Sequence, residues 1–152
     1  MRVLIDMQAL QSDSRYRGIG RYVRALVTRL LKLPNECRFT LLFNERARGI
    51  LESRDLAAFK EQGQGRIEVV YFNFPGSVNS LNEKNALFIE IAQRIREHFI
   101  SALNPDVVHV CSLFEGHHDD IAVSINKYYP HPAVVCTLYD LIPLVYPDIY
   151  LP

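Results

Sequence analysis

The chain alternates short apolar runs with amphipathic helical segments, and this alternation constrains its fold more than any other feature. Five runs are too short for helices and rich in strand-forming residues, at positions 2–6, 38–43, 67–72, 106–111 and 133–138. Strands separated mostly by helices predict a parallel sheet with right-handed crossovers and helices on both faces. The expected fold class is therefore α/β, with a Rossmann-like layout.

The helical segments are expected from apolar residues that recur every three or four positions. This spacing predicts a first helix over 19–33 and one or two amphipathic helices within 45–62. A capping box at 80–83 is expected to begin a long helix that ends before Pro105, because Pro cannot continue a helix. A further short helix is expected within 119–129.

Length and composition are typical of one soluble globular domain. The chain has 152 residues, of which 49% are hydrophobic and 22% charged, and its 17 basic residues balance 17 acidic ones. This balance excludes a polycation, so nucleic acid is not an expected partner. No apolar run approaches the roughly 18 residues of a membrane span, and no secretion signal is evident. The three cysteines, Cys37, Cys111 and Cys136, are interpreted as reduced core thiols of a cytosolic protein.

The charges are distributed unevenly along the chain. Residues 1–33 contain seven basic and two acidic side chains, a net charge of +5, so the remainder carries −5. A basic segment of this kind is typical of a surface that binds anions or faces a membrane, although a solvated helix face is an equal alternative.

A glycine pair stands at the start of the first helix. In sheets of this type, ligands bind beyond the carboxyl ends of the strands. Gly18 and Gly20 would let backbone amides approach a ligand there, and the helix dipole with Arg15, Arg17 or Arg21 would favour an anion, phosphate above all. A turn glycine with no ligand is the alternative.

Nicotinamide binding fits the sequence poorly. The dinucleotide fingerprint places three glycines directly after the strand, whereas here about a dozen residues intervene and Val23 occupies the third position. Glu45 could contact a ribose, but a solvated carboxylate at a helix start is the preferred interpretation. His109 lies in an apolar run and is interpreted as a hydrogen-bonded core histidine rather than a catalytic base.

Two further groups of polar residues follow the last two strands. The run 117–120, His-His-Asp-Asp, could ligate a metal, but capping of the helix expected there is the preferred explanation. Tyr139 and Asp140 place a phenol and a carboxylate just past the fifth strand, on the edge where ligands bind. An aspartate that only caps a turn is the alternative role for Asp140.

Several segments together resemble a known family. They are the run 3–6, the Gly-Ile-Gly-Arg-Tyr segment 18–22, the run 104–109 and the Tyr-Asp-Leu-Ile-Pro segment 139–143 with Tyr146-Pro147. In this order they resemble the N-terminal domain of family-4-type retaining glycosyltransferases, which have the two-domain GT-B architecture. The chain is most similar to the bacterial mannosyltransferase-like members that build lipopolysaccharide or capsule chains.

The resemblance implies roles for individual residues. Those expected to bind the donor's diphosphate are Gly18, Gly20 and Arg21. Those expected to bind the acceptor are Arg15, Glu115 and Tyr139. Many relatives carry His-Asp where this chain has Tyr-Asp at 139–140, so only Asp140 is carried over as a catalytic residue.

The resemblance also implies an activity. Residues 1–152 would form the acceptor-side domain of a GT-B enzyme, with the donor-binding C-terminal domain missing, so this fragment alone is expected to be inactive. The whole enzyme would transfer a hexose such as mannose, with retention, from a nucleotide-diphosphate sugar to a saccharide or lipid-linked saccharide, using no metal or cofactor. A cytoplasmic location with peripheral contact at the inner face of the cell membrane is expected. The alternative is a Rossmann-like module that binds a nucleotide or sugar without transferring it.

Overall fold

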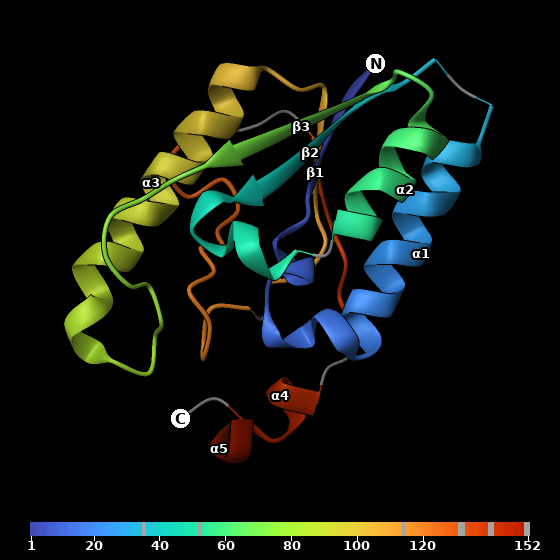
Figure 1. The fold of residues 1–152 in the computed structure, drawn as a ribbon. Helices are drawn as coiled ribbons and strands as arrows, with labels where there is room; N and C mark the ends of the chain where they lie inside the picture. The colour runs from blue at the N-terminus through green and yellow to red at the C-terminus, as the bar shows by residue number, and fades with distance from the viewer. Residues whose placement is uncertain (35, 52, 114, 131–132, 140–141, 151–152) are drawn as a thin grey trace.

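The core of the structure is one five-stranded parallel sheet (Figure 1). The computed structural model describes residues 1–34, 36–51, 53–113, 115–130, 133–139 and 142–150. The sheet order is β3-β2-β1-β4-β5. Its strands are β1 (Arg2–Asp6), β2 (Arg38–Asn44), β3 (Ile67–Phe72), β4 (Val107–Val110) and β5 (Val134–Cys136). This confirms the α/β, Rossmann-like fold class.

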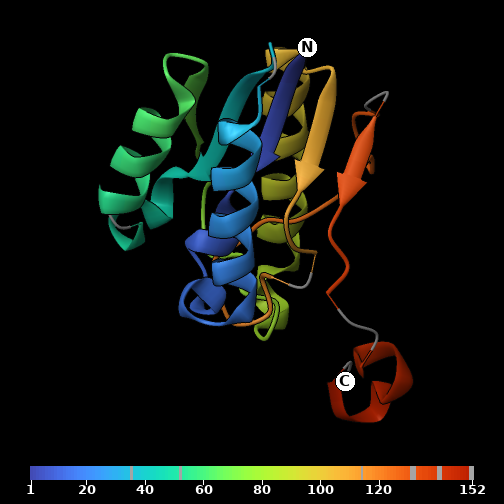
Figure 2. The same ribbon diagram turned by 90° about the vertical axis from the view of Figure 1, so that its right-hand side faces the viewer.

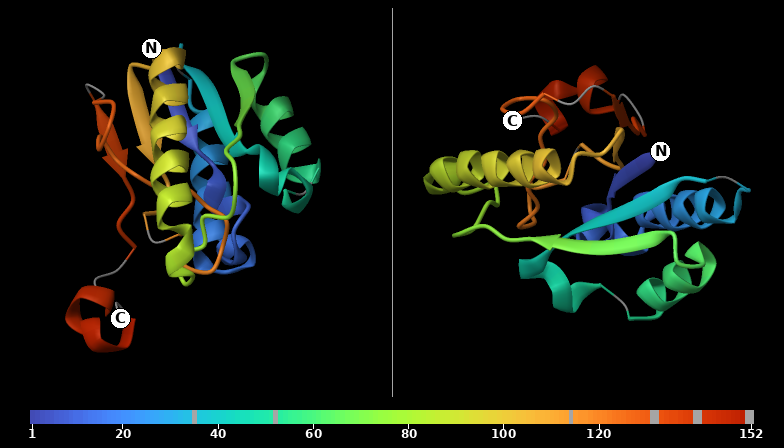
Figure 3. Two further views of the ribbon diagram at one scale, coloured as in Figure 1. Left: turned by 90° about the vertical axis from the view of Figure 1, so that its left-hand side faces the viewer. Right: turned by 90° about the horizontal axis from the view of Figure 1, so that it is seen from above.

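Helices cover both faces of the sheet (Figure 3). Helices α1 (Gly18–Lys32) and α2 (Ser53–Gly63) share one face, and α3 (Ala86–Leu103) covers the other. The short helices α4 (Ile142–Val145) and α5 (Pro147–Tyr150) lie away from the sheet (Figure 2). Short 3-10 segments form η1 (Gln8–Leu10), η2 (Asp13–Tyr16), η3 (Glu45–Ile50, with a kink at Ala47) and η4 (Glu83–Asn85).

The central strand β1 contributes to two separate hydrophobic clusters. Ile5 packs beneath α1 and α2, with Val27 and Phe59 from those helices. Leu4 faces the other way and packs with Ala92 and Ile100 of α3. This alternation follows from the two-residue period of a strand, and it explains why the apolar run is uninterrupted. Because β1 pairs with both β2 and β4, the crossovers reverse direction between β1 and β4.

The helix expected within 119–129 is absent. Residues 119–129, all described, form bends and irregular backbone. Asp119 accepts a hydrogen bond from the backbone of Asp13 at 3.3 Å. Asp120 accepts one from the Ser77 hydroxyl at 2.6 Å and another from the Val78 amide at 2.8 Å. The two carboxylates therefore tie this segment to other loops instead of capping a helix.

The capping box expected at 80–83 is also wrong. The backbone amide of Ser80 donates to the carbonyl of Gly116 at 3.1 Å, and the Ser80 hydroxyl lies 3.1 Å from Nδ1 of His117. These contacts hold residue 80 in a loop, so α3 begins later, at Ala86. The side chain of Asn82 instead caps the preceding turn η4, accepting from the Lys84 amide at 3.1 Å.

Among the described residues, no helix is long and apolar enough to cross a membrane. The three cysteines are free thiols, with Cys111 fully buried and Cys37 and Cys136 partly so.

Candidate functional site

The loops after β1 and β4 meet at the carboxyl edge of the sheet, where the strand order reverses. This is the place where open α/β sheets bind ligands. The loop after β1 carries η1 and η2 and leads into α1, and the loop after β4 crosses toward it. Their contact is direct, since Gln8 donates its side-chain amide to the carbonyl of Ala122 at 3.0 Å.

Glu115 lies where these two loops meet, surrounded by serine hydroxyls. Ser112 donates to its carboxylate at 3.0 Å, and the side chains of Ser12 and Ser14 lie near enough to lower its pKa. Burial raises the pKa of Glu115 above its ordinary value, although these hydroxyls oppose the shift. A partly buried carboxyl among hydroxyls can donate or accept hydrogen bonds, which suits binding of a polyhydroxylated ligand. Ser12, Ser14 and Ser112 were not predicted to belong to the site.

Tyr139 reaches the same edge from the segment after β5. Its hydroxyl donates to the carbonyl of Cys111, at the end of β4, at 2.7 Å. Its ring meets that of Tyr22 on α1 edge-on, with centroids 5.4 Å apart. Burial raises the pKa of Tyr139, with Tyr22 and Glu115 adding to the shift, so the phenol stays protonated near neutral pH. The structure therefore brings Glu115 and Tyr139 into one neighbourhood, beside the first turns of α1.

The two glycines of α1 differ in what surrounds them. At Gly20 a Cβ atom would stand 2.1 Å from the carbonyl oxygen of Arg15, so glycine is required there for the close packing of α1 against η2. At Gly18 a Cβ would meet no described atom within 4 Å. Gly18 is exposed, and the preceding residue, Arg17, makes no side-chain capping bond among the described residues. The first turn of α1 is thus open at Gly18 and closed by protein at Gly20.

Arg15 and Arg21 lie differently from each other. Arg15 is folded back onto its own loop, where its guanidinium donates to the carbonyl of Ser12 at 3.0 Å and lies 4.6 Å from the Tyr16 ring centroid. Arg21 is exposed and lines a shallow groove of about 460 Å³ along the outer face of α1. The other residues of this groove are Arg24, Ala25, Thr28, Arg29 and Lys32. Asp140 lies outside the described residues.

Over 154 aligned residues the chain is 31% identical to the serotype-specific mannosyltransferase WbdA of Escherichia coli. The alignment covers 99% of this chain and 18% of that protein. The chain is homologous to part of a bacterial mannosyltransferase. Two further WbdA sequences from Escherichia coli are each 43% identical over 60 residues, which is 40% of this chain and 7% of theirs. No family model matches the chain, and no solved structure matches it significantly.

A buried ion pair beneath the site was missed by the sequence analysis. Asp6, at the end of β1, accepts hydrogen bonds from the Arg96 guanidinium on α3 and from the side chain of Gln8. One signal existed, because Arg96 occupies the stripe of α3 defined by Ala92 and Ile100, at spacings of four residues. A charged residue on such a stripe needs a buried partner.

Structural contacts explain the other polar residues that the sequence singled out, namely His109, His117, His118 and Glu45. His109 forms a 3.0 Å hydrogen bond with the hydroxyl of Thr137, and burial lowers its pKa while Asp6 opposes the shift. This agrees with the interpretation as a core histidine. The rings of His117 and His118 pack edge-on, 4.8 Å apart, and the described residues contain no group of three potential metal ligands. Glu45 opens η3 and pairs with Arg48 at 3.1 Å.

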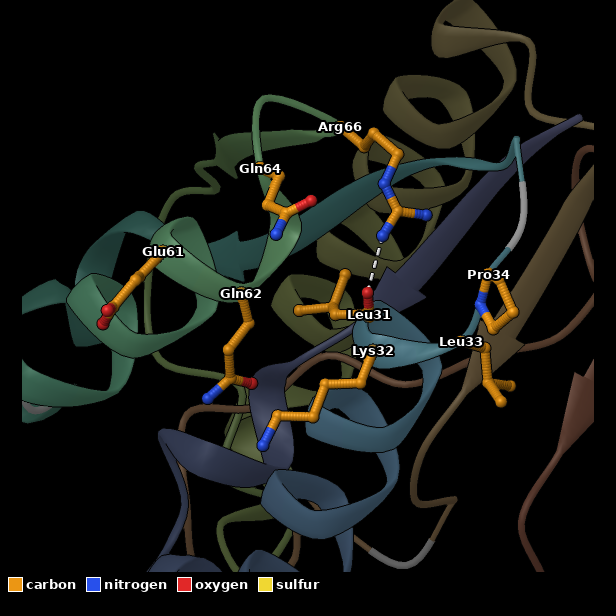
Figure 4. A pocket seen from close by; sticks show the side chains of 8 residues that line it. All are labelled: Leu31, Lys32, Leu33, Pro34, Glu61, Gln62, Gln64 and Arg66. Atoms are coloured by element: carbon orange, nitrogen blue, oxygen red, sulfur yellow. Dashed lines mark hydrogen bonds between the residues drawn. The ribbon is translucent and has the colours of Figure 1, made fainter.

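A larger cavity of about 670 Å³ lies elsewhere, at the amino ends of β2 and β3 (Figure 4). It is lined by the end of α1, including Leu31, and by the residues that lead into β3. Arg66 closes one side by donating to the carbonyl of Leu31 at 2.6 Å. Because ligands of such sheets bind at the carboxyl edge, this cavity is not the candidate site.

Proposed function

We propose that this chain is the acceptor-side part of a retaining glycosyltransferase of the GT-B type. The enzyme would transfer a hexose, with mannose as the expected sugar, from a nucleotide-diphosphate sugar to a saccharide acceptor in lipopolysaccharide or capsule synthesis. The observation that carries the proposal is the 31% identity to a mannosyltransferase over 99% of the chain. The chain spans about a fifth of that relative's length, so the donor half would be supplied by a further domain.

The open first turn of α1 is the proposed contact for the donor's diphosphate. Backbone N–H groups and the positive end of the helix dipole favour anions at a helix start. The lack of a side chain at Gly18 leaves the approach to these groups unobstructed by described atoms. Gly20 would contribute indirectly, by letting η2 pack closely against α1. Such fixed dipoles can stabilise the negative charge that develops on a departing diphosphate without a metal.

Glu115 and Tyr139 are the proposed acceptor contacts, with Arg15 at the outer side of the same loop. Glu115 and its serine partners offer several hydrogen-bonding groups to sugar hydroxyls. Asp140, which directly follows Tyr139, remains the proposed catalytic residue. The basic outer face of α1, which includes Arg21 and Arg29, is the proposed peripheral contact with anionic lipid.

The test is sugar transfer by the full-length protein that contains this chain. Gly18→Asp would place a carboxylate where the diphosphate approaches, so we expect at least a tenfold loss of kcat/KM for the donor. Gly49→Asp is the matched control, because a Cβ at Gly49 also meets no described atom within 4 Å and this residue lies in η3, after β2, rather than in α1. Asp140→Asn is expected to abolish transfer. Full activity in both site variants would refute the site. Binding of the nucleotide sugar without any transfer would favour the non-catalytic module.

A further inference from the structure

Tyr22 is an exposed aromatic side chain that borders the candidate site. It projects from α1 one turn after Gly18, and 43% of its surface is accessible. The ring of Tyr139 packs edge-to-face against the ring of Tyr22, at an interplanar angle of 86°. The segment after β5 therefore helps to position Tyr22. Edge-to-face pairs of this kind add about 0.5–1.5 kcal/mol beyond area burial, which favours one ring orientation.

Tyr139 is itself fixed at its far end. Its hydroxyl is anchored on the carbonyl of Cys111, so the pair links α1 to the ends of β4 and β5. Burial raises the pKa of Tyr139, and Tyr22 and Glu115 add to the shift, so both groups lie near its hydroxyl. The result is an ordered aromatic pair, with the hydrogen-bonding carboxyl of Glu115 on the neighbouring loop after β4.

This combination matches the two chemical sides of a pyranose ring. One face of such a ring presents apolar C–H groups, which pack on aromatic rings, and its edge presents hydroxyls, which need hydrogen-bond partners. Small-molecule sites combine apolar walls with a few placed polar groups in the same way. The entropy lost by ordering Tyr22 on binding a sugar is small, because a tyrosine has only two side-chain torsions and Tyr22 already packs against Tyr139.

We propose that Tyr22 is a sugar-binding residue whose ring packs against the C–H face of an acceptor pyranose while Glu115 binds its hydroxyls. The inference rests on the proposed function and names one contact within that site. Tyr16 provides the contrast. Its ring is more exposed, at 61%, and the Arg15 guanidinium lies over one of its faces, 4.6 Å from the ring centroid, in place of an aromatic partner such as Tyr139.

The experiment is saturation-transfer NMR on the purified full-length protein, with methyl α-mannopyranoside and a mannose disaccharide as probes. Saturation is expected on the ring C–H protons of the bound sugar. Tyr22→Ala and Tyr22→Leu should each weaken binding at least tenfold, whereas Tyr22→Phe should stay within threefold because packing needs the ring and not the hydroxyl. Tyr22→Leu keeps apolar contact with Tyr139, so an unchanged unfolding midpoint in that variant separates lost binding from lost structure. Tyr16→Ala is the matched control and should bind normally.

The outcomes also separate this inference from the proposed function. Sugar binding that depends on Tyr22 in a protein without transfer activity would support the inference and refute the enzyme. Transfer whose acceptor KM is unchanged in Tyr22→Leu would refute the inference and leave the enzyme intact. Absence of saturation transfer to either probe in the unsubstituted protein would also overturn the inference.

Discussion

The guanidinium of Arg96 donates from Nε to the carboxylate of Asp6 at 3.0 Å, joining the middle of α3 to the end of the central strand. Only 1% of Arg96 and 3% of Asp6 are exposed, so this ion pair is buried. Arg96 also donates to the carbonyl of Ser124 at 3.0 Å, and Gln8 completes the hydrogen bonding of Asp6. The network therefore joins β1, α3 and the loop after β4 directly beneath the candidate site.

Removing Arg96 is expected to be strongly destabilising, because it leaves Asp6 charged, buried and short of partners. Arg96→Met should lower the free energy of unfolding by about 3–5 kcal/mol. Asp6→Asn combined with Arg96→Met should restore part of the loss. Urea unfolding followed by circular dichroism measures both. Arg94→Gln, which removes an exposed pair with Glu90, is the control and should leave the midpoint nearly unchanged.

Substitution by alanine should change the stability of the protein differently at the two glycines of α1. Gly20→Ala forces a Cβ against the backbone of Arg15 and should cost about 1–3 kcal/mol, as overpacking does. Gly18→Ala meets no described atom and should be neutral or stabilising by up to about 1 kcal/mol, since Ala favours helix more than Gly. Thermal unfolding of the two variants side by side tests this. Equal destabilisation would contradict the close approach of η2 to α1.

The raised pKa of Glu115 predicts that this carboxyl contributes less to the stability of the fold as pH rises. A carboxyl whose pKa is raised by folding favours the folded state below its unfolded pKa, and that contribution is lost as pH rises through the folded value. Glu115→Gln should therefore gain stability relative to the unsubstituted chain as pH increases from 4 to 7. Urea midpoints at several pH values would show the trend. A difference that stays constant across this range would rule out the shift.

Glu97 should behave in the opposite sense. Its buried carboxylate accepts hydrogen bonds from the backbone amides of Lys127, Tyr128 and Tyr129 at 3.2, 2.7 and 2.9 Å. Although burial opposes the shift, these bonds hold its pKa below the ordinary value, so its contribution is present above the unfolded pKa and lost as pH falls through the folded one.

Glu97→Gln should consequently destabilise the chain at pH 7, by about 1–3 kcal/mol for the weakened hydrogen bonds. The difference from the unsubstituted chain should shrink as pH falls below about 4, near the pKa of an unfolded glutamate. Amide hydrogen exchange at residues 127–129 gives a local readout and should accelerate in the variant. Unchanged exchange there would show that the carboxylate does not hold this turn.

The strands were predictable because each is a short run rich in strand-forming residues, even though the edge strands β3 and β5 are only partly buried. The bounds of β1 and β3 agree with the sequence to the residue. The helix predicted within 119–129 does not form, for a physical reason. Asp119 and Asp120 are good first-turn residues, but partners at Asp13 and Ser77, far away in sequence, satisfy them better than helix amides would.

The candidate site was predictable only in part, for a related reason. Tyr139 and Glu115 follow strands, so their edge of the sheet could be inferred from order alone. The serines around Glu115 come from two loops about 100 residues apart, and no local pattern connects them. Gly18 and Gly20 look equivalent in sequence, and only the approach of the Arg15 backbone distinguishes them.

The strand order has a consequence for synthesis of the chain. Of the five strands of the sheet, β1 leaves the ribosome before the others, yet its second edge pairs with β4, whose partner for Val3 is Val107. At typical translation rates this edge waits about 5–20 s for its partner. Throughout that interval Leu4 and the neighbouring backbone are uncovered, so a nascent chain stalled before residue 107 should need a chaperone to stay unaggregated.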